Sequence, residues 1–265
     1  MRILTRRDTG LLTQWTFGTA GGDADALAFI TAAGITDITQ QLAIYTLVSD
    51  LKNYGIWTKL KALYPFVGGT STSHKFNLIN PADTNAAFRL VFTGGWTHSS
   101  NGALPNGTNA WANTFFNTST QFTTSSASFG IYSRTNDTST RIYGTATGTN
   151  IAHHNLGSNF TLGDTASLFY TANPSTGFLM CSRTTSSLLT AYRNSTSLGT
   201  NTTTIASYPN LNFYIGARNS NGFEGFFLNQ QHALSFMGDG LSGTESTNFY
   251  TAVQAYQTTL GRQII

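Results

Sequence analysis

Short runs of alternating apolar and polar residues fill the chain after Gly68, and they constrain its fold more than any other feature. The runs are rich in aromatic and β-branched residues, and Gly, Asn, Asp and Pro separate them, as in antiparallel strands joined by turns. About ten strands over about 170 residues predict two stacked sheets, because one open sheet of that width would leave long edges and an unburied face. The runs are KFNLIN, FRLVFTGG, SFGIYSRTN, RIYGTATG, ASLFYTAN, GFLMCSRTT, LLTAYRNS, LNFYIGAR and EGFFLNQQHALSFMGDG.

Before Gly68 the apolar spacing is helical. Asp23 is placed to cap a first helix that Gly34 ends, and a second helix is predicted over residues 37–55. Residues 56–65 fit a third helical turn, ended by a proline. A unit of about 45 residues is too small to be stable alone, so we expect it to dock on the rest of the chain or on a neighbouring subunit.

A last helix follows the strands. Ser242 and Glu245 form a capping box, and apolar residues recur at helical spacing behind them. These residues are Phe249, Val253, Tyr256 and Leu260. The predicted fold class is therefore mainly β, a two-sheet sandwich with an N-terminal helical segment and a C-terminal helix. The predicted segments are an arm over 1–22, a helical mount over 23–67 and a β-sandwich with its C-terminal helix over 68–265.

Composition excludes several classes of partner. The 265 residues carry 14 basic and 11 acidic side chains, and no basic stripe predicts binding to nucleic acid. The chain has no apolar stretch of 18 residues, so no membrane insertion is expected. The basic segment over residues 2–7 lacks a following apolar stretch, so no signal peptide is predicted. Cys181 is the single cysteine, which rules out an intramolecular disulfide and is typical of a small core residue.

The closing segments TGFLMCSRTTSSLLTAYRNSTSLG, LNFYIGARNSNG and HALSFMGDGLSGTESTNFYTAVQAYQTTLGR resemble the second half of a concanavalin A-like lectin fold of the laminin-G and pentraxin type. In that group a strand with Tyr-x-Asn at a turn precedes a Tyr-Ile-Gly-x-Arg strand and a final strand that leads into a short helix. The residues that carry the match are Tyr192, Asn194, Tyr214, Ile215, Gly216, Phe236, Gly238, Asp239, Leu241, Ser242 and Glu245. The resemblance implies a concanavalin A-like two-sheet jelly-roll sandwich, a fold that hosts lectins, hydrolases, lyases and inert spacers alike.

The segments GIWTKLKALYPFVGGT and AAFRLVFTGGWTHSSNGALPNGTNA resemble modules of tailed-bacteriophage virion proteins. This resemblance implies a protein of the phage particle, assembled in the bacterial cytoplasm. Its implied partners are other virion proteins and further copies of the chain. The position could be a capsid decoration, a head fibre or a tail fibre.

The carboxylates do not favour an enzyme. Glycoside hydrolysis needs two carboxylates about 5 to 9.5 Å apart, and the enzymes of this fold typically carry them in a Glu-x-Asp-x-Glu run that is absent here. The chain holds two glutamates, and Glu245 is explained by the helix cap, which leaves Glu224. His153 and His154 are adjacent, so a strand would place them on opposite faces and not around one metal. We predict no catalytic residue, no metal and no cofactor, although Asp239 could serve a calcium site.

The segment TGGWTHSSNGALPNGTNAWAN is the best candidate for ligand binding. Two tryptophans flank a region rich in Gly, Asn and Pro that is predicted to be a loop, and exposed indoles beside amides suit sugar rings. The predicted carbohydrate-binding residues are Trp96, Trp111, Asn101, Asn106 and Asn109. The alternative is that both tryptophans belong to the core.

Three hypotheses follow from the sequence. The first is a non-enzymatic phage structural protein that displays a lectin-like domain, with surface glycans as a further partner. The second is a dedicated carbohydrate receptor-binding module of a tail fibre. The third, which the carboxylates favour least, is a polysaccharide-degrading enzyme.

Overall fold

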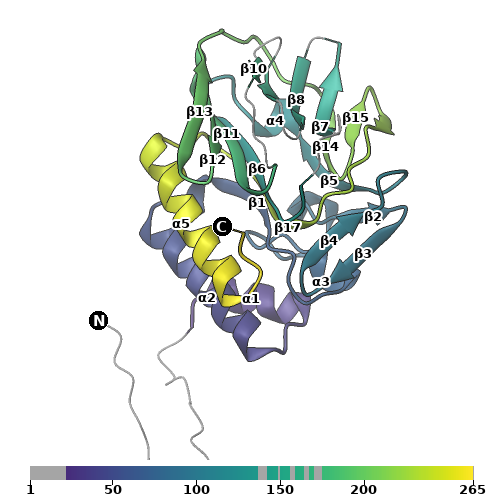
Figure 1. Cartoon of the computed structure of the whole chain (residues 1–265), viewed down its shortest axis with the longest axis vertical. Coiled ribbons are helices and arrows are strands. Elements are labelled where there is room, and N and C mark those ends of the chain that lie inside the picture. The colour runs from purple at the N-terminus through teal and green to yellow at the C-terminus, as the bar shows by residue number, and fades with distance from the viewer. Residues whose placement is uncertain are drawn as a thin grey trace, which may run out of the picture.

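The computed structural model describes residues 22–136, 142–148, 150–155, 159–163, 167–169 and 175–264. Two curled sheets pack face to face as a sandwich, and three helices cover the outer side of one of them (Figure 1). The predicted fold class is thereby confirmed: a mainly β sandwich with N-terminal helices and a C-terminal helix. No helix among the described residues is long and apolar enough to cross a membrane.

The first sheet, called sheet A, lies under the helices. Its strands run in the order β13-β12-β11-β6-β17-β4-β3, and β1 also pairs with β17. All of its described pairings are antiparallel. The strands are β13 (Thr196–Asn201), β12 (Leu188–Arg193), β11 (Gly177–Thr185), β6 (Ala127–Ser133), β17 (His232–Gly238), β4 (Gly102–Pro105), β3 (Trp96–Ser99) and β1 (Leu60–Tyr64).

The second sheet, called sheet B, runs in the order β10-β9-β8-β7-β14-β5-β2, and the β15–β16 hairpin is added to it where β15 pairs in parallel with β7. The strands are β10 (Ser167–Phe169), β9 (Asn159–Leu162), β8 (Asn150–Asn155), β7 (Ile142–Thr147), β14 (Asn212–Ile215), β5 (Trp111–Asn117), β2 (Val91–Thr93), β15 (Arg218–Ser220) and β16 (Phe223–Gly225).

The helices begin and end near the predicted caps. Asp23 accepts backbone N–H groups at the start of α1 (Ala24–Ala33), and Gly34 adopts the left-handed conformation after it. Ser242 and Glu245 form the predicted capping box at the start of α5 (Gly243–Thr259). The remaining helices are α2 (Ile38–Asn53), the short α3 (Ser71–His74) and α4 (Thr118–Gln121), and the 3₁₀ turns η1 (Trp57–Lys59) and η2 (Asn85–Ala87).

Two apolar cores result from this layering. One fills the space between the sheets, with Phe129 and Phe213 near its centre and the predicted core residue Cys181 fully buried in it. The other lies between sheet A and the helices, where Phe178 and Phe236 of the sheet contact Phe249 of α5. The N-terminal helices therefore dock on the rest of the chain, which was one of the two predicted alternatives.

Buried Arg262 joins four segments of the chain. Its guanidinium donates hydrogen bonds to the carbonyls of Pro65, Phe66, Ser100 and Ala233 and to the side chain of Gln257, over 2.6 to 3.2 Å. Pro65 and Phe66 follow β1, and Ser100 lies in the β3–β4 turn. Ala233 belongs to β17, and Gln257 belongs to α5. Since Arg262 is 1% exposed, the carbonyls take the place of water around the cation.

The structure corrects three predictions of local structure. The predicted third helical turn is η1 followed by strand β1, which pairs with β17. The predicted strand KFNLIN is irregular, because the Asn77 side chain bonds to backbone groups of Lys61, Leu63, Ile79 and Ala87 in place of a ladder. The predicted loop between the two tryptophans contains the β3–β4 hairpin.

Candidate functional site

The outer face of sheet B carries the candidate site. Along β5, residues Trp111, Asn113 and Phe115 are partly exposed, while the residues between them are buried in the core. This alternation is typical of a strand with one side against the core and one side outside. Strand pairing aligns one row of residues across this face, and the row is Val91, Asn113, Tyr214, Gly144 and His153.

Trp111 and Tyr214 form an aromatic pair on this face. Their rings are stacked, with centroids 4.4 Å apart and planes 22° apart. Tyr214 is 8% exposed, whereas Trp111 is only partly buried. Burial raises the pKa of the Tyr214 hydroxyl, and the negative charge of Glu224 adds to the shift. The pair is thus a rigid aromatic surface next to the amide of Asn113.

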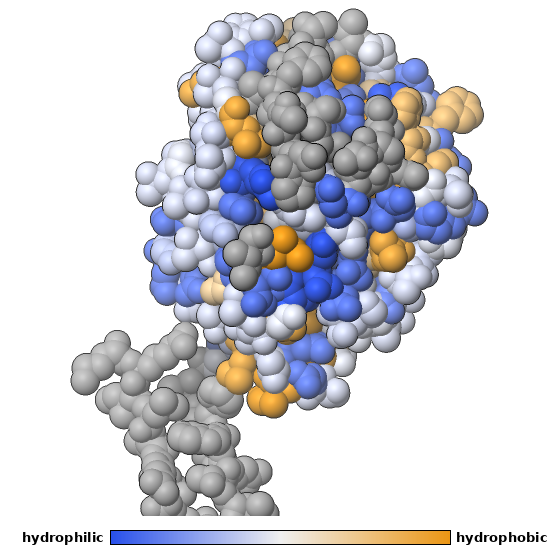
Figure 2. All heavy atoms as spheres, viewed as in Figure 1, coloured by the Kyte–Doolittle hydropathy of each residue, from blue (hydrophilic) through white to orange (hydrophobic). Residues whose placement is uncertain are grey.

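The β15–β16 hairpin borders the aromatic pair. Asn221 and Gly222 form its two-residue turn with positive φ values of 52° and 93°, as tight hairpins require. The turn presents Phe223, 76% exposed, and Phe226 beyond β16 is 46% exposed. Figure 2 shows apolar spheres at upper right, where Figure 1 places β15. Both side chains add exposed apolar surface to this hairpin and its exit.

Arg218 lies at the base of this hairpin. Its Nε donates to the Ser220 hydroxyl over 2.8 Å, and its guanidinium lies 3.9 Å from the centre of the Phe226 ring. Partial burial lowers the pKa of Arg218. A guanidinium over an aromatic face is a favourable cation–π contact, and it fixes where the charge lies.

His153 and His154 separate to opposite faces of β8, as their adjacency predicts. His154 is buried in the core, with its ring stacked on Phe160 at 3.7 Å. His153 occupies the outer row beside Gly144, and it is 6% exposed with no hydrogen-bond partner for its Nδ1 atom. Burial lowers the pKa of His153 to about 3, and the charge of Arg218 acts in the same direction.

The structure brings Trp96, Asn106 and Asn109 close together near the start of β5. There their polar atoms bond to the protein itself. Trp96 is partly buried against the core, and its indole N–H donates to the carbonyls of Thr93 and Trp111. The Asn106 amide donates to Asn109 Oδ1, Asn106 Oδ1 accepts the backbone N–H groups of Thr108 and Asn109, and Asn109 Oδ1 also accepts the backbone N–H of Gly95.

Asn101 lies at the other end of the β3–β4 hairpin, apart from the other predicted site residues. The sequence prediction therefore included Trp111 and missed its neighbours on this face. Asn113 lies two positions after Trp111 on β5, whereas Tyr214, Arg218 and Phe226 lie on or beside β14, β15 and β16, far along the chain. The alternation in WANTFFN and LNFYIGAR was the available signal for them.

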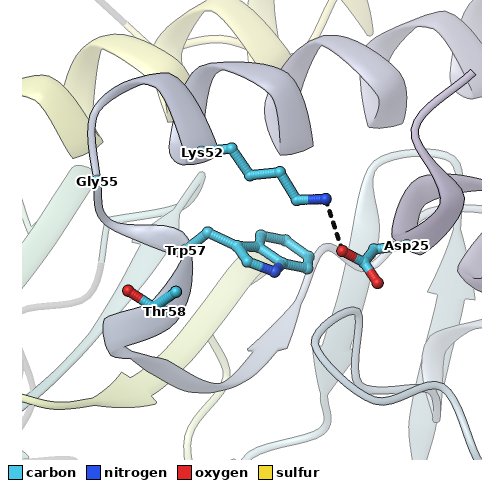
Figure 3. Close-up of a pocket in the computed structure, with 5 residues that line it drawn as sticks. All are labelled: Asp25, Lys52, Gly55, Trp57 and Thr58. Atoms are coloured by element: carbon cyan, nitrogen blue, oxygen red, sulfur yellow. Dashed lines mark hydrogen bonds and ion pairs between the residues drawn. The ribbon is translucent and has the colours of Figure 1, made fainter.

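The helical side has an open depression lined by Asp25, Lys52, Gly55, Trp57 and Thr58 (Figure 3). Lys52 binds Asp23 and Asp25 over 2.7 and 2.6 Å, and it lies 5.2 Å from the centre of the Trp57 ring. Partial burial raises the pKa of Asp23, but the hydrogen bonds from Lys52 and from backbone N–H groups together lower it more, so this pKa lies below its usual value. The charges in this depression are paired with one another, so they fasten α1 to α2.

A third polar cluster lies inside the fold. The Nδ1 atoms of His74 and His98 are 2.9 Å apart, and His232 is fully buried nearby, with Phe66 in contact with the rings of both His74 and His232. Burial lowers the pKa values of His74 and His232 to about 3. Among the described residues, no group of three or more His, Cys, Asp or Glu side chains is arranged to hold a metal ion.

The described carboxylates are mostly engaged elsewhere. Asp83 binds Lys75 and Arg89, Asp239 binds Lys61, and Glu245 binds Lys59. Glu224 differs from them, since it is exposed on β16 and close enough to Tyr214 to raise its pKa. Asp137 and Asp164 lie outside the described residues.

No family model matches the chain, and no curated protein matches its sequence. Among solved structures, the chain is similar to domain 4 of AbnA, an extracellular GH43 arabinanase from Geobacillus stearothermophilus, solved in complex with arabinotriose. The two share 17% sequence identity and a TM-score of 0.40, over 72% of this chain and 98% of that domain. This comparison assigns no function to the chain.

Proposed function

We propose that the chain is a non-enzymatic carbohydrate-binding module, built as a concanavalin A-like sandwich, that receives a saccharide on the outer face of sheet B. The observation that carries the proposal is the stacked Trp111–Tyr214 pair beside the partly exposed Asn113. The C–H faces of a sugar ring stack on such aromatic surfaces, and amides bond to its hydroxyls. Because the three side chains belong to paired strands, little ordering is needed on binding.

A binding role fits the carboxylates better than a hydrolytic one. A glycosidase needs an acid and a second carboxylate about 5 to 9.5 Å apart. In the described part of the chain, Glu224 is the carboxylate placed beside the aromatic pair, and Asp83, Asp239 and Glu245 are engaged in ion pairs. A single exposed glutamate supplies one of the two groups that the reaction requires.

The proposal includes display of this module on a tailed-phage particle, as a capsid decoration, head fibre or tail fibre that self-associates. Its support is the resemblance of the segments around Trp57 and Trp96 to virion modules. The helical side also carries exposed apolar residues suited to attachment: Leu27 is 51% and Ile38 56% exposed. Imaging of particles with and without the protein tests this part. Density on the head or tail supports it, and unaltered particles would contradict it.

Binding to a panel of neutral and acidic oligosaccharides, measured by calorimetry, tests the carbohydrate-binding role. We expect Trp111→Ala to weaken binding at least tenfold, because truncation removes the aromatic surface. Trp57→Ala is the matched control, since Trp57 is also partly buried but lies on the helical side. Trp57→Ala should retain the affinity of the unchanged protein.

Two results would refute the carbohydrate-binding role. One is the absence of binding to any oligosaccharide at millimolar concentration. The other is full affinity in a folded Trp111→Ala variant. Trp96→Ala is a poor test, because the Trp96 indole bonds to two backbone carbonyls and its loss would disturb the β3–β4 hairpin.

A further inference from the structure

Arg218 is a cation without a carboxylate partner. No described carboxylate lies within ion-pair distance of it, whereas Lys59, Lys61 and Lys75 each bind an acid. The Nε atom of Arg218 is bonded to the Ser220 hydroxyl, and its two terminal nitrogens have no hydrogen-bond acceptor in the described structure. A half-buried guanidinium whose planar fork is open is suited to a carboxylate or phosphate oxygen pair.

His153 is a buried imidazole close to Arg218, whose charge acts on it. It is more than nine-tenths buried, and its Nδ1 atom has no hydrogen-bond partner. Leaving such an atom unsatisfied costs about 1 to 3 kcal/mol, so each case in a native structure calls for an explanation. In the register of sheet B, Gly144 pairs with His153 on one side and with Arg218 on the other. His153 and Arg218 therefore flank a position that carries no side chain.

The aromatic pair borders the same position. Gly144 also pairs with Tyr214, on which Trp111 is stacked. Neighbouring strands are about 4.8 Å apart. A sugar ring stacked on Trp111 would therefore be separated from Arg218 by about the length of one or two sugar residues. The stacked Trp111–Tyr214 pair and the Arg218 guanidinium thus lie on one continuous face.

We propose that this face selects saccharides that carry a carboxylate, such as uronic acids. The carboxylate binds the fork of Arg218 with His153 beside it, and the sugar ring stacks on Trp111. This inference rests on the proposed carbohydrate-binding function and adds the charge of the ligand to it. A carboxylate on the sugar is favoured over phosphate because Glu224 is also near the pair, and a singly charged group meets less repulsion from it.

Matched acidic and neutral ligands test the inference. The probes are oligogalacturonate, oligomannuronate and a glucuronate-containing oligosaccharide, each compared with its carboxyl-reduced form by calorimetry at pH 7. We expect at least one acidic ligand to bind the unchanged protein tenfold or more tightly than its reduced form. Arg218→Gln should remove that difference and leave the affinity for the reduced form within twofold.

Three further variants sharpen the result. Arg218→Lys keeps the charge but loses the fork, so it should retain part of the preference and remain informative if Arg218→Gln folds poorly. Glu224→Gln should strengthen binding of the acidic ligand by removing repulsion. Lys52→Gln removes a cation that binds Asp23 and Asp25 on the helical side, and it should change nothing.

The possible outcomes separate the two proposals. Equal binding of acidic and reduced ligands, with no effect of Arg218→Gln, would overturn the charge preference and leave the carbohydrate-binding function standing. Failure of every ligand, acidic or neutral, to bind the unchanged protein would overturn both.

Discussion

Acidification to pH 5 should strongly destabilise the folded state of this protein, because several buried histidines are held neutral in it. Burial lowers the pKa values of His74, His153 and His232 to about 3 and that of His154 well below its usual value. In the unfolded chain each imidazole titrates near pH 6.5. Between these two values the unfolded state binds more protons than the folded state, so stability is full above about pH 6.5 and falls as the pH falls.

The expected loss is large. Each neutral histidine should cost about 2 kcal/mol of unfolding free energy between pH 7 and pH 5, and the four together about 8 kcal/mol. A native domain typically has about 5 to 15 kcal/mol in all. The carboxylates Asp23, Asp83 and Glu245 have lowered pKa values, so their contribution is lost only below about pH 4.5. The range from pH 6.5 to 5 therefore reports on the histidines.

Urea unfolding followed by tryptophan fluorescence at several pH values measures this effect. Between pH 6 and pH 5 the free energy of unfolding should fall by about 5 kcal/mol. This slope corresponds to the uptake of nearly four protons by the chain when it unfolds. His232→Phe should flatten that slope by about one proton, whatever its effect on stability at pH 7, since the ring lies among Phe66, Trp96 and Tyr143. A slope below one proton in the unchanged protein would show that these histidines are not held neutral by burial.

Three other predictions concern the helical side. Arg262→Met should lower the free energy of unfolding by about 4 kcal/mol, because buried carbonyls lose their donor; a change below about 1 kcal/mol in urea unfolding would argue against this role. Ser242→Ala should cost about 1 kcal/mol through loss of the α5 cap, whereas Thr247→Ala on the same helix should stay within about 0.5 kcal/mol in the same assay. Leu27→Asp combined with Ile38→Asp should reduce any oligomer to a lower mass in light scattering, and an unchanged mass would mean that self-association uses another surface.

Local signals in the sequence predicted the helix ends well, and they failed where a partner is far along the chain. Asp23 and Ser242 cap helices through bonds to residues two or three positions away, so their effect is visible in a short window. Leu60 and Leu63 also fit helical spacing, yet they lie in a strand. Their partners Gly238 and Phe236 in β17 are remote in sequence, and pairing with them overrides the local pattern.

The same reasoning explains what the sequence indicated about the site. Trp111 was predicted because an indole beside asparagines is a local pattern, but its neighbour Tyr214 is a hundred residues away and is brought close by the pairing of β14 with β5. Asn106 was selected for its exposed amide. In the structure that amide holds a turn, because asparagine side chains readily replace backbone hydrogen bonds in turns. Composition alone does not distinguish an asparagine that binds a ligand from one that holds a turn.

The layering of the fold separates the surface proposed for attachment from the surface proposed for saccharide binding. The helices cover the outer face of sheet A, so Leu27 and Ile38 on the helical side are separated from Trp111 and Arg218 by two sheets. Packed sheets are about 10 Å apart, and a helical layer adds a similar thickness. Sites separated by more than about 10 Å with no shared partner usually act additively. Substitutions at Leu27 and Ile38 should therefore leave the intrinsic affinity for a saccharide unchanged, and Trp111→Ala should leave the oligomer intact. Any gain in apparent affinity from self-association would come from several copies binding one polymer, which a short oligosaccharide would not reproduce.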